Sequence, residues 1–166
     1  MTASGRRLVP ALLATALLAC GGNAGAGGPG AITTCPITSP PASPTFAGTV
    51  YPAIAASCGK ASVSCHGPPS GGELPKGKIN FSTADGRTVD DVYADIVNKP
   101  PASAPAGYLI VKPWDPTLSW LVVKVTQDDP GGAGNAYGNR MPYSGADLCQ
   151  ATIDTIVTWI SQGAVP

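Results

Sequence analysis

Glycine and proline supply 39 of the 166 residues, 21 and 18 respectively, and this abundance constrains the fold more than any other feature. Glycine raises the entropic cost of ordering the backbone, and proline interrupts helices and sheet ladders. A compact helical bundle or a regular sheet throughout is therefore excluded. Hydrophobic residues still make up 43%, enough for a core, while basic and acidic residues balance at 10 each. A nucleic-acid binder would show a basic surplus. We expect one small, loop-rich domain with a disordered stretch.

The first 20 residues have the pattern of an export signal that ends in a lipid attachment site. Two arginines precede 12 uncharged residues, Leu8 to Ala19, a run too short to span a bilayer as a mature helix. The sequence Leu17-Leu18-Ala19-Cys20 resembles the lipobox of bacterial lipoproteins, in which cleavage precedes a lipidated cysteine. We expect residues 1–19 to be a signal peptide and Cys20 to carry the anchor. An ordinary signal peptide, or an uncleaved anchor, is the alternative.

The next segment is expected to be a flexible tether. Residues 21–44 contain 6 Gly, 5 Pro and no charged residue, so they have little to bury. The sequence therefore predicts a tether over residues 20–44 and one folded domain over residues 45–166.

Four segments of this domain carry apolar residues at helical spacing, although the third would also suit a strand. Trp159 lies beside the fourth stripe and is expected to join the core. The stripes are Phe46, Val50 and Ile54; Val89, Val92, Tyr93, Ile96 and Val97; Leu118, Leu121, Val122 and Val125; and Leu148, Ile153, Ile156, Val157 and Ile160.

Residues at the ends of these segments are typical of helix caps. Thr49 is expected to cap the first helix, and Thr88 with Asp91 forms a variant of the capping box. Asp115 suits the N-cap of the third helix, with a proline after it. Gly163 suits the position that follows the last helix.

The chemistry-bearing residues of the domain are few. The only histidine, His66, directly follows Cys65, and Cys58 precedes that pair. The only methionine besides Met1 is Met141, in the loop before the last helix. This arrangement resembles class I c-type cytochromes, in which two cysteines hold haem by thioethers, the adjacent histidine is the proximal iron ligand and a distant methionine is the other.

The resemblance extends over about residues 46–166. The segments 115–121, 140–142 and 159–164 (Asp-Pro-Thr-Leu-Ser-Trp-Leu, Arg-Met-Pro and Trp-Ile-Ser-Gln-Gly-Ala) are similar to a divergent cytochrome c group seen in predicted bacterial lipoproteins, including those of myxobacteria and planctomycetes. It implies a mostly α fold, a small cytochrome c-like domain of about four short helices with long loops around one covalently attached haem c.

The resemblance also implies roles for single residues. Cys58 and Cys65 would form the haem thioethers, and His66 and Met141 would be the axial ligands of the iron. A proline carbonyl, of Pro68 or Pro69, would accept the other ring N–H of the histidine.

The resemblance further implies that the first and last helices cross and pack, so that Val50 or Ile54 touches Ile156 or Trp159.

One departure from the family pattern matters. The usual motif is C-x-x-C-H, whereas six residues separate Cys58 from Cys65 here. Loop-closure entropy grows slowly with length, so a longer loop can still bring Cys58 to the second vinyl group. Attachment through Cys65 alone stays open, and so does a haem-free protein with a Cys58–Cys65 disulfide and His66 on the surface.

Other chemistries fit less well. A blue-copper site needs two histidines, and a structural zinc site needs four well-spaced ligands. No phosphate-binding glycine motif is present, and the only histidine is already claimed for haem, which leaves no attractive Ser-His-Asp set. The remaining cysteines, Cys35 and Cys149, can meet if the first and last helices pack, and we expect a disulfide between them; free buried thiols are the alternative.

The sequence therefore predicts an electron carrier rather than an enzyme. The expected function is a membrane-tethered monohaem c-type cytochrome that passes single electrons between redox proteins, without nucleic acid. Its expected location is the bacterial cell envelope, at the outer membrane facing the periplasm or the cell surface. The alternative is a haem-free lipoprotein with a disulfide-stapled cytochrome-like fold that acts as an interaction or structural module.

Overall fold

The computed structural model describes residues 35, 37–59, 66–69, 74–132, 134, 136–143 and 147–166. Within them the chain is mostly helical and has no β-strand, which confirms the expected small α fold. Cys20, Cys65 and the predicted signal peptide lie outside the described residues. The α-helices are α1 (Tyr51–Cys58), α2 (Val89–Ile96), α3 (Trp120–Thr126) and α4 (Gln150–Ser161); a π-helical turn, η1 (Phe46–Val50), leads into α1, and two 3₁₀ turns are η2 (Lys76–Lys78) and η3 (Pro116–Leu118).

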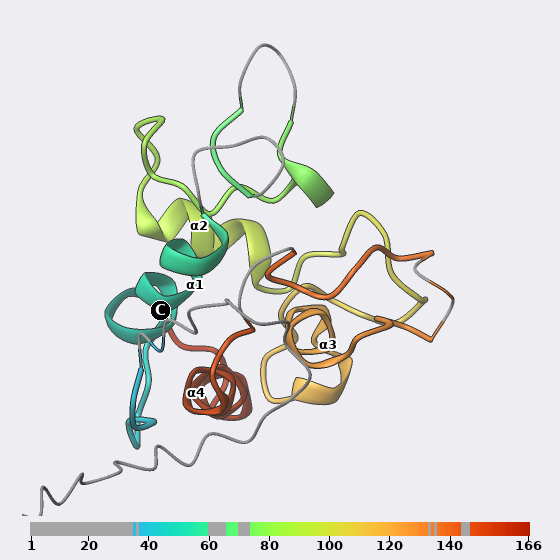
Figure 1. Cartoon of the computed structure of the whole chain (residues 1–166). Coiled ribbons are helices and arrows are strands. Elements are labelled where there is room, and N and C mark those ends of the chain that lie inside the picture. Colours follow the sequence, from blue (N-terminus) through green and yellow to red (C-terminus); the bar gives the residue numbers. More distant parts are fainter. Residues whose placement is uncertain are drawn as a thin grey trace, which may run out of the picture.

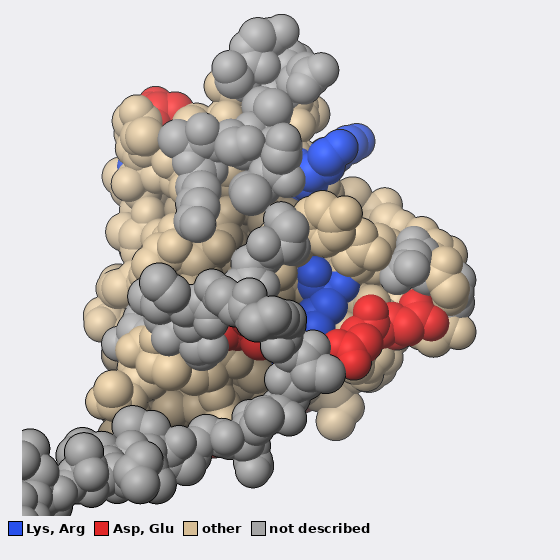
Figure 2. All heavy atoms as spheres, in the orientation of Figure 1, with Lys and Arg blue, Asp and Glu red and all other residues tan. Residues whose placement is uncertain are grey.

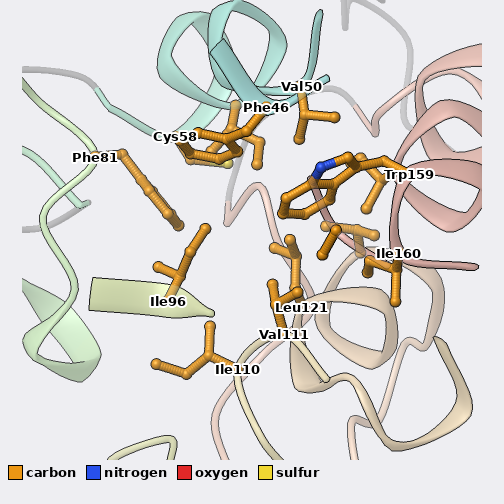
Figure 3. Packing of buried hydrophobic residues seen from close by; sticks show 14 of the residues in the cluster. Phe46, Val50, Cys58, Phe81, Ile96, Ile110, Val111, Leu121, Trp159 and Ile160 are labelled. Atoms are coloured by element: carbon orange, nitrogen blue, oxygen red, sulfur yellow. The ribbon is translucent and has the colours of Figure 1, made fainter. Parts of the chain in front are cut away.

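The core forms where the first and last helices meet. The rings of Phe46 in η1 and Trp159 in α4 lie 5.4 Å apart between centroids, and both side chains are buried. Val50, Ile54 and Ile156 belong to the same buried cluster, part of which is drawn in Figure 3. The expected packing of the first helical segment on the last is therefore confirmed, as is the place of Trp159 in the core.

The C-terminal residues lie between these helices rather than trailing away (Figure 1). The carbonyl of Val165 accepts hydrogen bonds from the backbone N–H of Phe46, at 3.1 Å, and from Nε1 of Trp159, at 2.7 Å. The hydroxyl of Tyr93 in α2 donates to the carbonyl of Ala164 at 2.8 Å. The end of the chain thus joins η1, α2 and α4.

An extended segment, residues 108–111, connects the other two helices. Val111 forms an isolated parallel bridge with Val97 at the end of α2, and Leu109 forms one with Ser119 just before α3. This pairing buries Ile110 and Val111 and fixes α3 beside the end of α2.

Two of the predicted cap arrangements are confirmed. The side chain of Thr88 accepts from the N–H of Asp91 and the Asp91 carboxylate accepts from the N–H of Thr88, a reciprocal capping box on α2. At the end of α4, Gly163 has φ +96°. Its N–H donates to Ile160, and the next N–H donates to Trp159, which is the Schellman pattern.

The other two cap predictions are wrong in part. The side chain of Thr45, not Thr49, caps the first helical segment, because the chain is already helical from Phe46 onward. Asp115 caps only the short turn η3, and α3 begins separately after Ser119. The break has a local cause, since the Ser119 hydroxyl binds the backbone at Asp115 and Lys112 and the residue adopts an extended conformation.

The described end of the predicted tether lies against α4. The side chain of Gln162 donates to the carbonyl of Ala42 at 2.9 Å, and Pro44 is buried. In the part of the chain that the structure describes, no helix is long and apolar enough to cross a membrane.

Candidate functional site

A cavity of about 520 Å³ lies among the end of α1, His66, the stretch 76–81, α3 and residues 136–143 before α4. This volume is within the ~300–1,000 Å³ typical of pockets for small molecules and cofactors. Its lining is mostly apolar, and it includes Cys58, His66 and Met141. Three of the four predicted haem-contacting residues therefore share one cavity, although 75 positions separate the histidine from the methionine.

The His66 ring is held by its surroundings in one orientation. Its Nδ1 lies 3.2 Å from the carbonyl oxygen of Ile79. The ring of Phe81 packs edge-on against it, with centroids 5.2 Å apart. Because a carbonyl can only accept, Nδ1 carries the proton and, in the neutral imidazole, Nε2 keeps a free electron pair. The Ile79 carbonyl thus leaves Nε2 as the ring atom able to bind a metal ion.

The protonation of His66 also suits ligation. Burial lowers the pKa of His66, and the positive charge of Lys124 acts in the same direction, while the carbonyls of Ile79 and Lys76 raise it by a smaller amount. The net effect is a pKa below the ordinary value of 6.5, so the imidazole stays neutral at neutral pH. A neutral imidazole is the form that binds metals.

The unusual cysteine spacing does not keep His66 away from Cys58. Cys58 is the last residue of α1, and its carbonyl accepts a hydrogen bond of 3.2 Å from the N–H of His66. In a C-x-x-C-H motif the same two groups are four positions apart and would be joined by an ordinary α-helical bond. Here the bond spans eight positions, so the two groups meet despite four additional residues between them.

Met141 is fixed through its backbone at the end of α3. Its N–H donates to the carbonyl of Lys124 at 2.7 Å, and its side chain is half-buried and lines the cavity. The preceding residue, Arg140, reaches Asp128 at 2.9 Å and Asp147 at 3.4 Å. Those carboxylates stand at the two ends of the loop that carries Met141. Figure 2 shows acidic and basic side chains beside one another at the right of the molecule.

Aromatic side chains form another part of the cavity wall. Trp120, at the start of α3, is buried and meets Tyr108 and Tyr137 edge-on, with centroids 5.3 and 5.9 Å away. Trp120 and Tyr137 line the cavity together with Phe81 and Leu121 and give it flat apolar surfaces, while Tyr108 supports the Trp120 ring from outside the lining. Such surfaces suit a planar apolar group.

The expected proline acceptor for the histidine is wrong, because the hydrogen bond goes to Ile79 and not to Pro68 or Pro69. The chain returns past the ring at residues 76–81, and a backbone carbonyl needs no particular side chain, so the sequence carried no signal for it. Lys124 was missed as well. The sequence did carry a sign of it, because Lys124 is the only charged residue in the otherwise apolar stretch of α3.

The structure brings Cys35 and Cys149 together outside the cavity lining. Both are free thiols in the structure, and the Cys35 thiol hydrogen-bonds to Cys149. That bond raises the pKa of Cys35. Burial raises the pKa of Cys149, but hydrogen bonds from Cys35 and Thr152 outweigh it and leave the pKa lowered. The disulfide between them stays a prediction.

Comparisons with other proteins identify no relative. No protein-family model matches the chain, and no curated protein or solved structure matches it. Among the described residues, no group of three or more His, Cys, Asp or Glu side chains is arranged to hold a metal ion. The case for a function therefore depends on the cavity and on the motifs.

Proposed function

We propose that this chain is a membrane-tethered monohaem c-type cytochrome that carries single electrons between redox proteins in the bacterial cell envelope. The observation that supports this most is the shared cavity, which Cys58, His66 and Met141 all line. A haem requires an apolar cleft with a neutral imidazole on one ligand position. The orientation and lowered pKa of His66 fit that requirement.

The residues that line the cavity have separate roles in this proposal. When bound, the haem would supply one-electron exchange between iron(III) and iron(II). His66 offers Nε2 while Ile79 holds Nδ1. Met141 offers a neutral thioether, a ligand that favours reduced iron and raises the potential. The apolar wall around Trp120 and Leu121 would shield a bound haem from water. Cys58 and Cys65 would supply the covalent attachment.

The membrane anchor is the second part of the proposal. Its support is the lipobox at Cys20 and the preceding uncharged run, both outside the described residues. The proposed location is the outer membrane, facing the periplasm or the cell surface.

A denaturing gel stained for haem tests the cofactor directly. The protein would be produced in a bacterium that carries the cytochrome c maturation proteins, and wild type is expected to retain the stain after boiling. His66→Ala should abolish the low-spin visible spectrum, and Cys65→Ala should remove the thioether beside the histidine. Cys58→Ala should shift the pyridine haemochrome band if the long spacing permits two thioethers.

Matched cysteine variants provide the control. Cys35→Ala and Cys149→Ala change thiols outside the cavity lining and should leave the haem stain unchanged. If the matured wild-type protein carries no covalent haem, the carrier proposal is wrong. The haem-free lipoprotein, stapled by a disulfide and acting as an interaction module, would then be the better description.

A further inference from the structure

Lys124 forms hydrogen bonds to the loop that carries Met141 through both its backbone carbonyl and its side-chain ammonium group. Its backbone carbonyl accepts from the N–H of Met141 at 2.7 Å. Its ammonium Nζ donates to the carbonyls of Tyr137, at 3.1 Å, and Asn139, at 2.5 Å. Three hydrogen bonds from one helical residue thus hold the loop from position 137 to position 141.

The backbone conformation of α3 at Lys124 and that of the loop at Gly138 both favour this contact. Lys124 lies in the last turn of α3, where carbonyl groups lack helical partners, and the N–H of Met141 takes the place of the next helical N–H. In the loop, Gly138 has φ +79°, a conformation that L side chains rarely adopt. It allows the carbonyls on either side to turn toward the same ammonium group. A Cβ at Gly138 would stand 3.4 Å from Nζ.

The setting of the ammonium is unusual for a lysine. Lys124 is half-buried, lines the cavity and lies over the Trp120 ring at 5.9 Å from the centroid. Burial lowers its pKa. Within the described part of the chain no carboxylate forms an ion pair with it. Its partners are loop carbonyls and an aromatic face, so its position serves the loop rather than a surface charge pair.

We propose that Lys124 is a positioning residue that clamps the loop 137–141 to α3 and so holds the Met141 thioether in the cavity wall. The clamp is a property of the protein chain. Its effect on iron ligation rests on the proposed function. By this reasoning the ease with which the methionine leaves the iron is set by Lys124, on a loop that is otherwise rich in glycine.

Two measurements on the full-length protein test the clamp. The first is hydrogen exchange of the peptide that contains residues 136–143, followed by mass spectrometry with and without haem. Lys124→Met keeps most of the apolar stem and removes the ammonium, and we expect exchange in this peptide to rise on the order of tenfold, as for the loss of charge-assisted hydrogen bonds. Lys99→Met, at an exposed lysine, is the matched control and should change nothing.

The second measurement uses the oxidised haem-loaded protein and titrates it with imidazole, which must displace Met141 to bind the iron. Lys124→Leu removes the ammonium without placing a second thioether in the cavity, and it should bind imidazole roughly tenfold more tightly and lose part of the sulfur-to-iron charge-transfer band, because the open loop is more populated. Gly138→Ala perturbs the same clamp from the loop and should act in the same direction, which provides a second variant if Lys124→Leu folds poorly.

The outcomes separate the two proposals. If the matured wild-type protein carries no haem, the proposed function is wrong, and faster exchange in the haem-free Lys124→Met variant still supports the clamp. Unchanged exchange of the 136–143 peptide in both Lys124→Met and Gly138→Ala overturns the clamp. Faster exchange with unaltered imidazole affinity in the haem-loaded protein overturns the positioning role of Lys124 toward Met141.

Discussion

Replacing Trp159 by phenylalanine tests the packing that joins the two ends of the domain, and we expect it to lower the free energy of unfolding by about 2 kcal/mol. Trp159 is fully buried, contacts the Phe46 ring and donates from Nε1 to the Val165 carbonyl at 2.7 Å. Phenylalanine keeps an aromatic ring in place but removes the donor and part of the buried volume.

The size of the effect follows from the second donor to the same carbonyl. Val165 also accepts from the N–H of Phe46, so the carbonyl keeps a partner in the variant. The loss is therefore the net value of one hydrogen bond, about 1 kcal/mol, rather than the larger penalty of an orphaned buried acceptor. The ring atoms removed from a close-packed core add roughly another 1 kcal/mol.

The assay is urea and thermal unfolding followed by far-ultraviolet circular dichroism. A loss of about 2 kcal/mol should lower the melting temperature by roughly 8 °C in a domain of this size. Trp114→Phe is the control, because the same substitution is made at a side chain that is 73% exposed, and its effect should stay within ~0.5 kcal/mol. Equal effects at the two tryptophans would refute the reasoning.

Three further predictions address the cap, the histidine and the anchor. Thr88→Ala removes the N-cap of α2 and should cost about 1 kcal/mol in urea unfolding, whereas the exposed Thr126→Ala should cost less; equal costs would contradict the role of the capping box. In the haem-free protein, burial lowers the pKa of His66 in the folded state. As the pH drops below 6.5, the unfolded chain therefore binds a proton that the folded chain does not, and the urea midpoint should fall. His66→Gln should reduce this pH dependence of stability, and an unaltered pH profile in this variant would show that His66 does not cause it. Cys20→Ala should move the protein from the detergent phase to the aqueous phase in a partition assay, and unchanged partitioning would exclude the lipid anchor.

Local features of the fold could be predicted from the sequence because the interactions that produce them span few residues. The capping box needs only Thr88 and Asp91, three positions apart. Gly163 ends α4 because its backbone adopts a positive φ there. The apolar stripes of the helices likewise reflect a period that is visible in any window of a few turns.

The sequence could predict which side chains belong to the candidate site, but not that they meet in one cavity. His66 and Met141 stood out as the only histidine and the only methionine besides Met1, and a family resemblance linked them. That they line one cavity depends on how α1, α3 and the loop before α4 pack, which no local pattern encodes.

By itself, the sequence determined the residue types proposed to bind a haem, the stretches that become helices, the start of α2 and the end of α4. Only the tertiary structure decided that Ile79 orients the His66 ring, that the Cys58 carbonyl meets the His66 N–H across eight positions, and that Lys124 holds the methionine loop. All three contacts use backbone carbonyls. Every residue has a carbonyl group whatever its side chain, so only the path of the folded chain selects which ones are used.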